Sequence, residues 1–314
     1  KKPAHVGIQI FENYSLEELR NYIDWTPFFS SWQLRGKFPA IFKNTIVGKE
    51  AKRLYDDAQV LLDQIINEKW LTAKAVIGIF EANSLENDDI EIHLNKGNEK
   101  MYFHCLRQQV QKAKGLPNRS LADFVAPKTA GKTDYIGTFA VTAGIGIEKY
   151  VKQFEDNNDD YRAIMLKALA DRFAEAFAER MHERVRKEFW AYEADENLSN
   201  EDLISEKYKG IRPAPGYPAC PDHTMKQDLW RLLDVEKNIG IRLTESCAMY
   251  PAASVSGLYF SHDESTYFGI GKLAKDQIAD LAKRKNVETA VMEKWLAPNS
   301  VSYTHLRAHE TRFY

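Results

Sequence analysis

Apolar residues recur at three- and four-residue intervals along several stretches of the chain, a spacing typical of amphipathic helices. The strongest pattern runs over residues 48–70 and places apolar side chains on one helical face. The longest runs over residues 159–192, where a repeat of four drifts around a helix and so predicts contacts with more than one neighbour. Shorter helices are predicted over residues 15–23, 197–208, 222–239, 275–285 and 288–296.

Short apolar runs bounded by turn-forming residues predict β-strands. They cover residues 75–80, 90–94, 101–105, 135–142, 241–249 and 254–260, with turns at 83–88 and 95–98 between the first three. The polar stretch 261–265 predicts a hairpin turn, so residues 266–271 are expected to return beside 254–260. Because strands follow one another with helices grouped between them, the pattern predicts a single α+β domain and not a doubly wound parallel sheet.

Composition narrows the class of protein and its compartment. The chain of 314 residues is 44% hydrophobic, enough for a buried core. Its 43 basic and 45 acidic residues leave a net charge of −2, which offers no basic surface for nucleic acid or an anionic membrane. No apolar run reaches the roughly 18 residues needed to cross a bilayer, and three distant cysteines fit a reducing compartment. We expect a soluble, cytoplasmic protein, and the start at Lys1 suggests a piece of a longer one.

Motifs of self-contained enzymes are missing from the sequence. Gly144 and Gly146 follow a predicted strand but lack the third glycine of a dinucleotide-binding fingerprint, so they predict a turn. Cys220 and His223 lie close together without a second pair of ligands, so no zinc site is expected. No nucleophile elbow, zinc-protease helix or phosphate-binding loop occurs.

Residues 210–221, here called the proline ribbon, contain four prolines (Gly-Ile-Arg-Pro-Ala-Pro-Gly-Tyr-Pro-Ala-Cys-Pro). Proline fixes φ and removes a backbone donor, so neither a helix nor a regular strand can run through this segment. Arg212 supplies a fixed cation, Gly216 permits close approach to the main chain, and Tyr217 supplies a ring. This combination suits a flat small molecule with an anionic end. A connector lying over the surface explains the same composition, and both interpretations stay open.

Two acidic residues have unusual neighbours. Asp24 lies between Ile23 and Trp25 and can either cap the next helical turn or form a partly buried carboxylate that needs a partner. Glu175 lies among alanines on one face of the predicted helix 159–192. The small neighbours leave room for a ligand, although a solvated acidic face gives the same pattern.

The proline ribbon and residues 19–29 together resemble the C-terminal activation domain of cobalamin-dependent methionine synthase. Further similar stretches are residues 167–172, 182–187, 244–246 and 253–257, in the same order. The likeness runs from about Val6 to Pro298. We therefore expect residues 1–299 to form one activation domain and residues 300–314, which do not resemble the family, to lie outside it.

The resemblance implies a bent, central antiparallel sheet flanked by helices, unlike the Rossmann-type methyltransferases. It implies S-adenosylmethionine as ligand and, as function, the reductive re-methylation of cob(II)alamin to methylcobalamin. The expected partners are a cobalamin-binding domain of the same enzyme and flavodoxin or a flavoprotein reductase as electron donor. The chain would then be a methyltransferase fragment that lacks the substrate and cobalamin domains, with no metal site.

The family's ligand contacts fall on residues of this sequence. Its Arg-x-x-x-Gly-Tyr motif and the nearby backbone contacts, its two acids and its aromatic pair correspond to Arg212, Ala214, Gly216, Tyr217, Asp24, Glu175, Tyr267 and Phe268. Phe268 stands where relatives have a second Tyr, and it has no hydroxyl to offer.

The resemblance also implies a role for each side chain. Arg212 would hold the methionine carboxylate and Asp24 the ammonium group. Glu175 would lie near the ribose or the sulfonium, and Tyr217 and Tyr267 would pack against the adenosine. None is a general acid or base, because methyl transfer to cob(I)alamin needs no proton, so no catalytic residue is expected.

Two other functions stay open. A structural docking domain without ligand binding would use the proline ribbon as a connector, and saturable binding of S-adenosylmethionine separates it from the leading interpretation. A free-standing methyltransferase acting on a small metabolite would turn over without any cobalamin domain.

Overall fold

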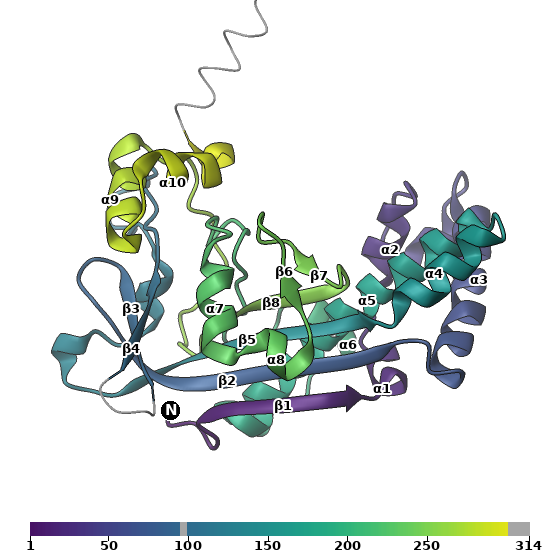
Figure 1. Ribbon diagram of the computed structural model, residues 1–314, viewed down its shortest axis with the longest axis horizontal. Helices are drawn as coiled ribbons and strands as arrows, with labels where there is room; N and C mark the ends of the chain where they lie inside the picture. The colour runs from purple at the N-terminus through teal and green to yellow at the C-terminus, as the bar shows by residue number, and fades with distance from the viewer. Residues whose placement is uncertain (95–98, 301–314) are drawn as a thin grey trace, which may run out of the picture.

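A six-stranded antiparallel sheet forms the centre of the computed structural model, which describes residues 1–94 and 99–300 (Figure 1). The strands lie in the order β4-β3-β2-β5-β8, and β1 pairs with β2 beside β3. Their bounds are β1 Gly7–Tyr14, β2 Thr72–Ser84, β3 Asp89–His93, β4 Lys100–His104, β5 Asp134–Ile145 and β8 Ser254–Tyr259. The predicted α+β class with a central antiparallel sheet is confirmed.

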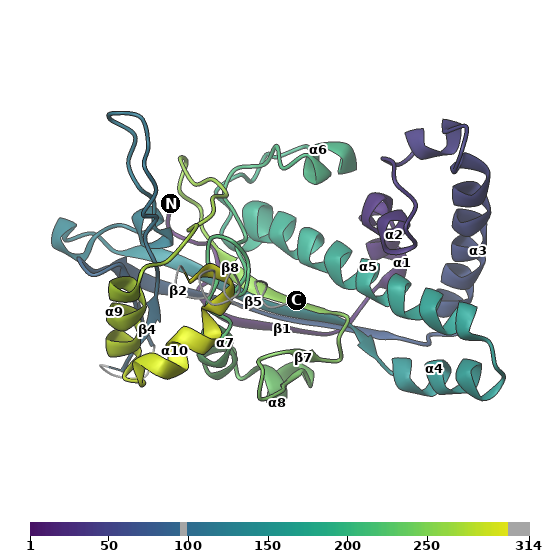
Figure 2. The same cartoon turned by 90° about the horizontal axis from the view of Figure 1, so that it is seen from above.

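Helices cover both faces of this sheet, as the two views show (Figures 1 and 2). Alternate side chains of β2 point to opposite faces, so Ile77 joins one apolar core and Val76 the other. The Ile77 core includes residues of the first five helices of the chain. These are α1 Leu16–Arg20, α2 Trp25–Ser31, α3 Gly48–Asn67, α4 Ile147–Asp156 and α5 Asp160–Arg184. The Val76 core packs against α7 Met225–Leu233 and α8 Val235–Ile239.

The remaining helices lie at the periphery. Helices α9 Lys275–Lys285 and α10 Thr289–Trp295 form a third apolar cluster with Leu106. They lie beside the β3–β4 end of the sheet (Figure 1). Helix α6 Asn200–Ile204 precedes the proline ribbon. Among the described residues, no helix has both the length and the apolar character needed to cross a membrane.

Helix α5 is the longest element and continues into a π-helical turn, Val185–Phe189. Its apolar residues, among them the fully buried Phe173 and Phe177, contact β5, β8 and all four of the helices α1 to α4. The drifting apolar pattern predicted that this helix contacts several neighbours, and that prediction is confirmed. The same helix therefore fixes the position of any polar side chain it carries toward the sheet.

Two strand predictions are wrong. Residues 241–249 do not form one strand but belong to an antiparallel pair of short strands, β6 Arg242–Leu243 and β7 Met249–Tyr250. The polar residues between them turn the chain back, and Cys247 takes a left-handed φ of 58°. Residues 266–271 do not return beside β8. The edge of β8 is occupied by the proline ribbon, whose Ile211 pairs with Phe260 through backbone bonds of 3.1 and 3.0 Å.

Other boundaries also differ from the prediction. Strand β1 and helix α4 were not predicted, and the predicted helix 222–239 is divided at Asp234, which has a left-handed φ of 48°. Ser300, the first residue of the predicted tail, is buried and forms a bridge with Leu273. The rest of that tail, residues 301–314, and the predicted turn 95–98 lie outside the described residues.

Candidate ligand-binding site

The proline ribbon forms part of the fold and is not a connector lying over the surface. Besides the pairing of Ile211 with Phe260, the carbonyl of Pro213 accepts a backbone hydrogen bond of 2.9 Å from Leu258 of β8. Past this point the chain turns tightly, because the N–H of Gly216 donates to the carbonyl of Cys220 at 2.7 Å. Prolines tolerate such an edge position, where only some of the backbone groups are paired.

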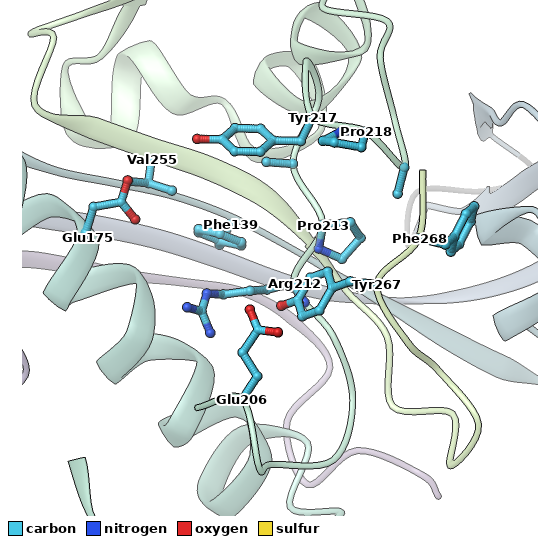
Figure 3. A pocket seen from close by; sticks show the side chains of 12 residues that line it. Phe139, Glu175, Glu206, Arg212, Pro213, Tyr217, Pro218, Val255, Tyr267 and Phe268 are labelled. Carbon is cyan, nitrogen blue, oxygen red and sulfur yellow. The ribbon is translucent and has the colours of Figure 1, made fainter. Parts of the chain in front are cut away.

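A cavity of about 490 Å³ lies between the ribbon, α5 and the sheet (Figure 3). Phe139 of β5 and Val255 of β8 contribute apolar surface from the sheet, and Pro213 contributes apolar surface from the ribbon. The structure also brings together at this cavity six of the eight residues that the sequence singled out: Glu175, Arg212, Ala214, Tyr217, Tyr267 and Phe268.

The other two predicted residues, Gly216 and Asp24, do not line the cavity. Gly216 forms the bend of the ribbon with a φ of 97°, a conformation that favours glycine. Asp24 is the N-cap of α2, and its carboxylate accepts a hydrogen bond of 2.9 Å from the N–H of Thr26. The structure thus shows the capping role that the local sequence allowed.

The guanidinium of Arg212 is anchored on the inner side of the cavity. Its Nη2 donates to Oε2 of Glu179 at 2.7 Å, and its Nη1 donates to the hydroxyl of Tyr208 at 2.8 Å. Nη1 also lies 3.3 Å from Nδ1 of His182. Because arginine can only donate, Nδ1 of His182 is the acceptor, and the imidazole proton lies on Nε2.

Burial explains the protonation states of two groups that hold Arg212, His182 and Glu179. His182 is fully buried, and burial together with the cations Arg186 and Arg212 holds its pKa well below 6.5, which agrees with a neutral ring. Burial raises the pKa of Glu179, although the attraction of Arg212 opposes this effect. Glu179 and Arg212 therefore form a largely desolvated ion pair at the base of the cavity.

The aromatic residues after β8 hold the ribbon as well as line the cavity. The hydroxyl of Tyr267 accepts a hydrogen bond of 3.0 Å from the backbone N–H of Arg212 and lies 3.3 Å from the hydroxyl of Tyr208. Phe268 packs edge-on against Phe124 in the core. Tyr217, in contrast, is 62% exposed, so its ring is free to cover a bound molecule.

Two carboxylates face the cavity. Glu175 projects from α5, and Glu206 follows α6 with its side chain directed toward Arg212 and Tyr267 (Figure 3). Glu206 has a left-handed φ of 54°, a conformation that costs a non-glycine residue on the order of 1 kcal/mol and is often found at functional sites. The cavity lining thus contains one cation and two anions.

Three residues of the site were not predicted from the sequence: Glu179 and Tyr208, which hold Arg212, and Glu206, which lines the cavity. Glu179 could have been found, because it lies one helical turn after Glu175 and so on a neighbouring part of the same helix face. Glu206 and Tyr208 carry no comparable signal, because their positions depend on a turn of irregular backbone. Among residues 1–94 and 99–300, no group of three or more His, Cys, Asp or Glu side chains is placed to hold a metal ion.

Comparison with known proteins agrees with this geometry. Residues 15–286 match the family model described as "Vitamin B12 dependent methionine synthase, activation domain". A solved structure described as the crystal structure of the MetH reactivation domain bound to AdoHcy is 53% identical to this chain, with a TM-score of 0.91. The match covers 96% of this chain and 92% of that one.

Proposed function

Because the chain belongs to the activation-domain family of vitamin B12-dependent methionine synthase, we propose that it binds S-adenosylmethionine in the cavity beneath the proline ribbon. One observation carries the proposal: a guanidinium, two carboxylates and several aromatic rings from distant parts of the sequence meet at one cavity. Its volume of about 490 Å³ is in the range of small-molecule sites. The AdoHcy in the description of the similar solved structure supports the same ligand class.

Arg212 is the group we assign to the ligand's carboxylate. A guanidinium has five N–H donors, and the contacts with Glu179, Tyr208 and His182 use three of them. The hydrogen on Nε and one on Nη2 have no partner among the described residues. These two donors suffice for a charge-assisted contact with a carboxylate, which is worth about 1.5–3 kcal/mol.

The carboxylates match the positive end of S-adenosylmethionine. Glu175 and Glu206 together outweigh the charge of Arg212 in the cavity lining, so the site attracts a ligand whose net charge is positive. We assign Glu175 to the neighbourhood of the ribose or the sulfonium, with Glu206 adding negative charge near Arg212. We also assign Asp24 to the ligand's ammonium group, which requires the methionine end of the ligand to extend beyond the cavity toward the N-cap of α2, because Asp24 does not line the cavity.

The ribbon and the aromatic residues provide the surface for the adenosine. Tyr217 and Tyr267 offer rings, Phe268 offers an apolar edge, and Ala214 brings ribbon backbone to the cavity wall. We assign the backbone contacts with the heterocycle to Ala214 and assign Gly216, which does not line the cavity, to the bend that shapes this wall. Aromatic residues suit this role because they bury a large flat area at low cost in conformational entropy.

In this proposal the domain serves a methyltransferase by positioning the methyl donor. When bound, S-adenosylmethionine supplies the methyl group that re-methylates cob(II)alamin held by a separate cobalamin-binding domain, with an electron from flavodoxin or a flavoprotein reductase. The protein residues bind and orient the donor, and none is asked to move a proton. The three buried, free cysteines fit the reducing cytoplasm.

Calorimetric titration of the purified chain with S-adenosylmethionine tests the proposal. We expect saturable binding that weakens about ten- to hundredfold in Arg212→Ala. Arg231→Ala is the matched control, because Arg231 also pairs with a carboxylate, that of Asp228, but is 70% exposed and does not line this cavity. Circular dichroism of each variant establishes that it is folded.

Two outcomes contradict the proposal at different levels. A folded wild-type chain that shows no binding at millimolar S-adenosylmethionine would leave a docking domain without ligand. Unchanged affinity in Arg212→Ala would remove the carboxylate role of Arg212 while leaving the ligand assignment intact.

A further inference from the structure

Three groups hold the guanidinium of Arg212 from the side opposite the cavity, and all three are nearly inaccessible to solvent. Glu179 is 7% exposed, His182 is 0% exposed and Tyr208 is 7% exposed. Only Glu179 among them carries a charge that compensates Arg212. Glu179 of α5 is therefore the one charged group among the three that orient Arg212.

The pairing of Glu179 with Arg212 uses one oxygen of the carboxylate. Oε2 accepts from Nη2 at 2.7 Å, whereas Oε1 is buried and has no hydrogen-bond partner among the described residues. A bidentate pair would occupy a second N–H of the guanidinium. The one-oxygen contact leaves that donor without a partner among the described residues, on a side chain that lines the cavity.

A second cation, Arg186, lies near the same tyrosine ring as Arg212. The guanidinium carbon of Arg186 lies 4.4 Å from the centre of the Tyr208 ring, and that of Arg212 lies 5.5 Å from the same ring. Glu196 accepts two hydrogen bonds of 2.7 Å from Arg186, one at each carboxylate oxygen, so both of its oxygens are already paired. Without Glu179, Arg212 would face Arg186 in a desolvated region with no carboxylate of its own.

The cavity offers Arg212 an alternative partner. Glu206 lines the same cavity, and its side chain points toward Arg212 (Figure 3). If Glu179 did not hold the guanidinium, Arg212 would gain by turning to Glu206 and would then present its donors to a protein carboxylate instead of to a ligand.

We propose that Glu179 is a positioning residue that holds Arg212 in a carboxylate-binding orientation, so that the site prefers ligands with a carboxylate. The inference rests on the proposed function, because it names the group that sets the ligand preference of the same cavity. It assigns Glu179 a role without contact to the ligand.

Two ligands that differ only in the carboxylate test this role. The probes are S-adenosylmethionine and decarboxylated S-adenosylmethionine, titrated calorimetrically into wild type, Glu179→Ala and Glu179→Gln. We expect Glu179→Ala to weaken S-adenosylmethionine at least tenfold and the decarboxylated ligand less than twofold. Glu179→Gln keeps an oxygen that accepts from Nη2, so its loss for S-adenosylmethionine should be smaller than that of Glu179→Ala.

Glu183→Gln is the matched control. Glu183 is a buried glutamate one turn farther along α5, where it binds Tyr22 and Arg180 instead of the cavity residues. The ratio of the affinities of the Glu183→Gln variant for the two ligands should equal that of wild type. If Glu179→Ala does not fold, the comparison rests on Glu179→Gln, for which the expected result is a reduced preference for the carboxylate ligand.

Each outcome has a distinct meaning. Equal losses for both ligands in the Glu179 variants would show a purely structural role and overturn the inference, as would an unchanged preference for the carboxylate. If wild type binds neither ligand, the proposed function fails and the inference fails with it.

Discussion

The ring of His223 lies directly against the main chain of Gly216, at the bend of the proline ribbon. A Cβ atom added to Gly216 would lie 2.2 Å from Cε1 of His223. The ring cannot retreat freely, because Nδ1 of His223 accepts a hydrogen bond of 3.1 Å from the buried Lys226. The bend that shapes one wall of the cavity therefore requires glycine for two reasons, its φ of 97° and the lack of a side chain.

We expect Gly216→Ala to lower the free energy of unfolding by about 2–4 kcal/mol, the sum of a strained φ and an overpacked contact. Urea denaturation measures the loss. Gly240→Ala is the matched control, because Gly240 has a similar φ of 78° but no atom within 4 Å of an added Cβ, so it reports the φ term alone. Equal losses in the two variants would contradict the steric role of His223.

The ion pair between Arg186 and Glu196 is expected to be a strong local determinant of stability. Arg186 has no exposed side-chain surface and Glu196 only 6%, so removing one partner leaves a buried charge without compensation. Glu196→Gln should lower the free energy of unfolding by about 3–5 kcal/mol. Asp156→Asn, which breaks the exposed pair with Lys152, should change it by less than about 1 kcal/mol.

Stability should fall as pH drops below about 6.5, the ordinary pKa of histidine. His182 and His223 both have pKa values below that range in the fold, His182 through burial and two arginines and His223 through burial and Lys226. The unfolded chain therefore binds protons at these two rings that the folded chain does not bind. Each ring lowers the free energy of unfolding by about 1.4 kcal/mol for every pH unit below about 6.5.

Urea denaturation between pH 5.5 and 7.5 measures this slope. His182→Gln keeps an oxygen that can accept from Arg212, and it should remove the part of the slope due to His182 while leaving the part due to His223. His262→Gln, which removes an exposed ring, serves as control. A slope in His182→Gln as steep as in wild type would contradict a neutral, buried His182.

Asp24→Asn separates the cap of α2 from the proposed contact with the ligand's ammonium. Asparagine caps helices about as well as aspartate, so the free energy of unfolding should change by less than about 0.5 kcal/mol. The affinity for S-adenosylmethionine should fall about three- to tenfold if the charge contacts the ligand. Wild-type affinity in this variant would mean that Asp24 serves only as the cap.

The sequence predicts the fold well where one local pattern dominates. Helices α3 and α5 follow from apolar periodicity, since the burial of one face decides their structure. The prediction of one strand over residues 241–249 is wrong, because apolar character does not show where a chain reverses. The prediction of a strand over 266–271 is wrong, because local apolar character cannot show which backbone already occupies the edge of β8. That edge is filled by Ile211 and Pro213, about 45 residues away in sequence.

The site was predictable only in part for a similar reason. Arg212, Tyr217 and Glu175 are recognisable from residue type, neighbours and family resemblance. The partner that fixes Arg212 is Glu179, and its buried charge becomes visible only once α5 is packed on the sheet. Glu206 reaches the cavity through an irregular turn, which no periodic pattern encodes.

The pairing of the proline ribbon with β8 also protects the molecule from self-association. An unpaired edge strand is a template for β-pairing between chains, and natural proteins often cover such edges or place prolines along them. Here Ile211 and Pro213 satisfy part of the β8 edge, and a segment with four prolines cannot itself recruit a further strand. A substitution that dislodges the ribbon would therefore free an aggregation-prone edge at the same time as it opens the cavity, and loss of binding would come with loss of solubility.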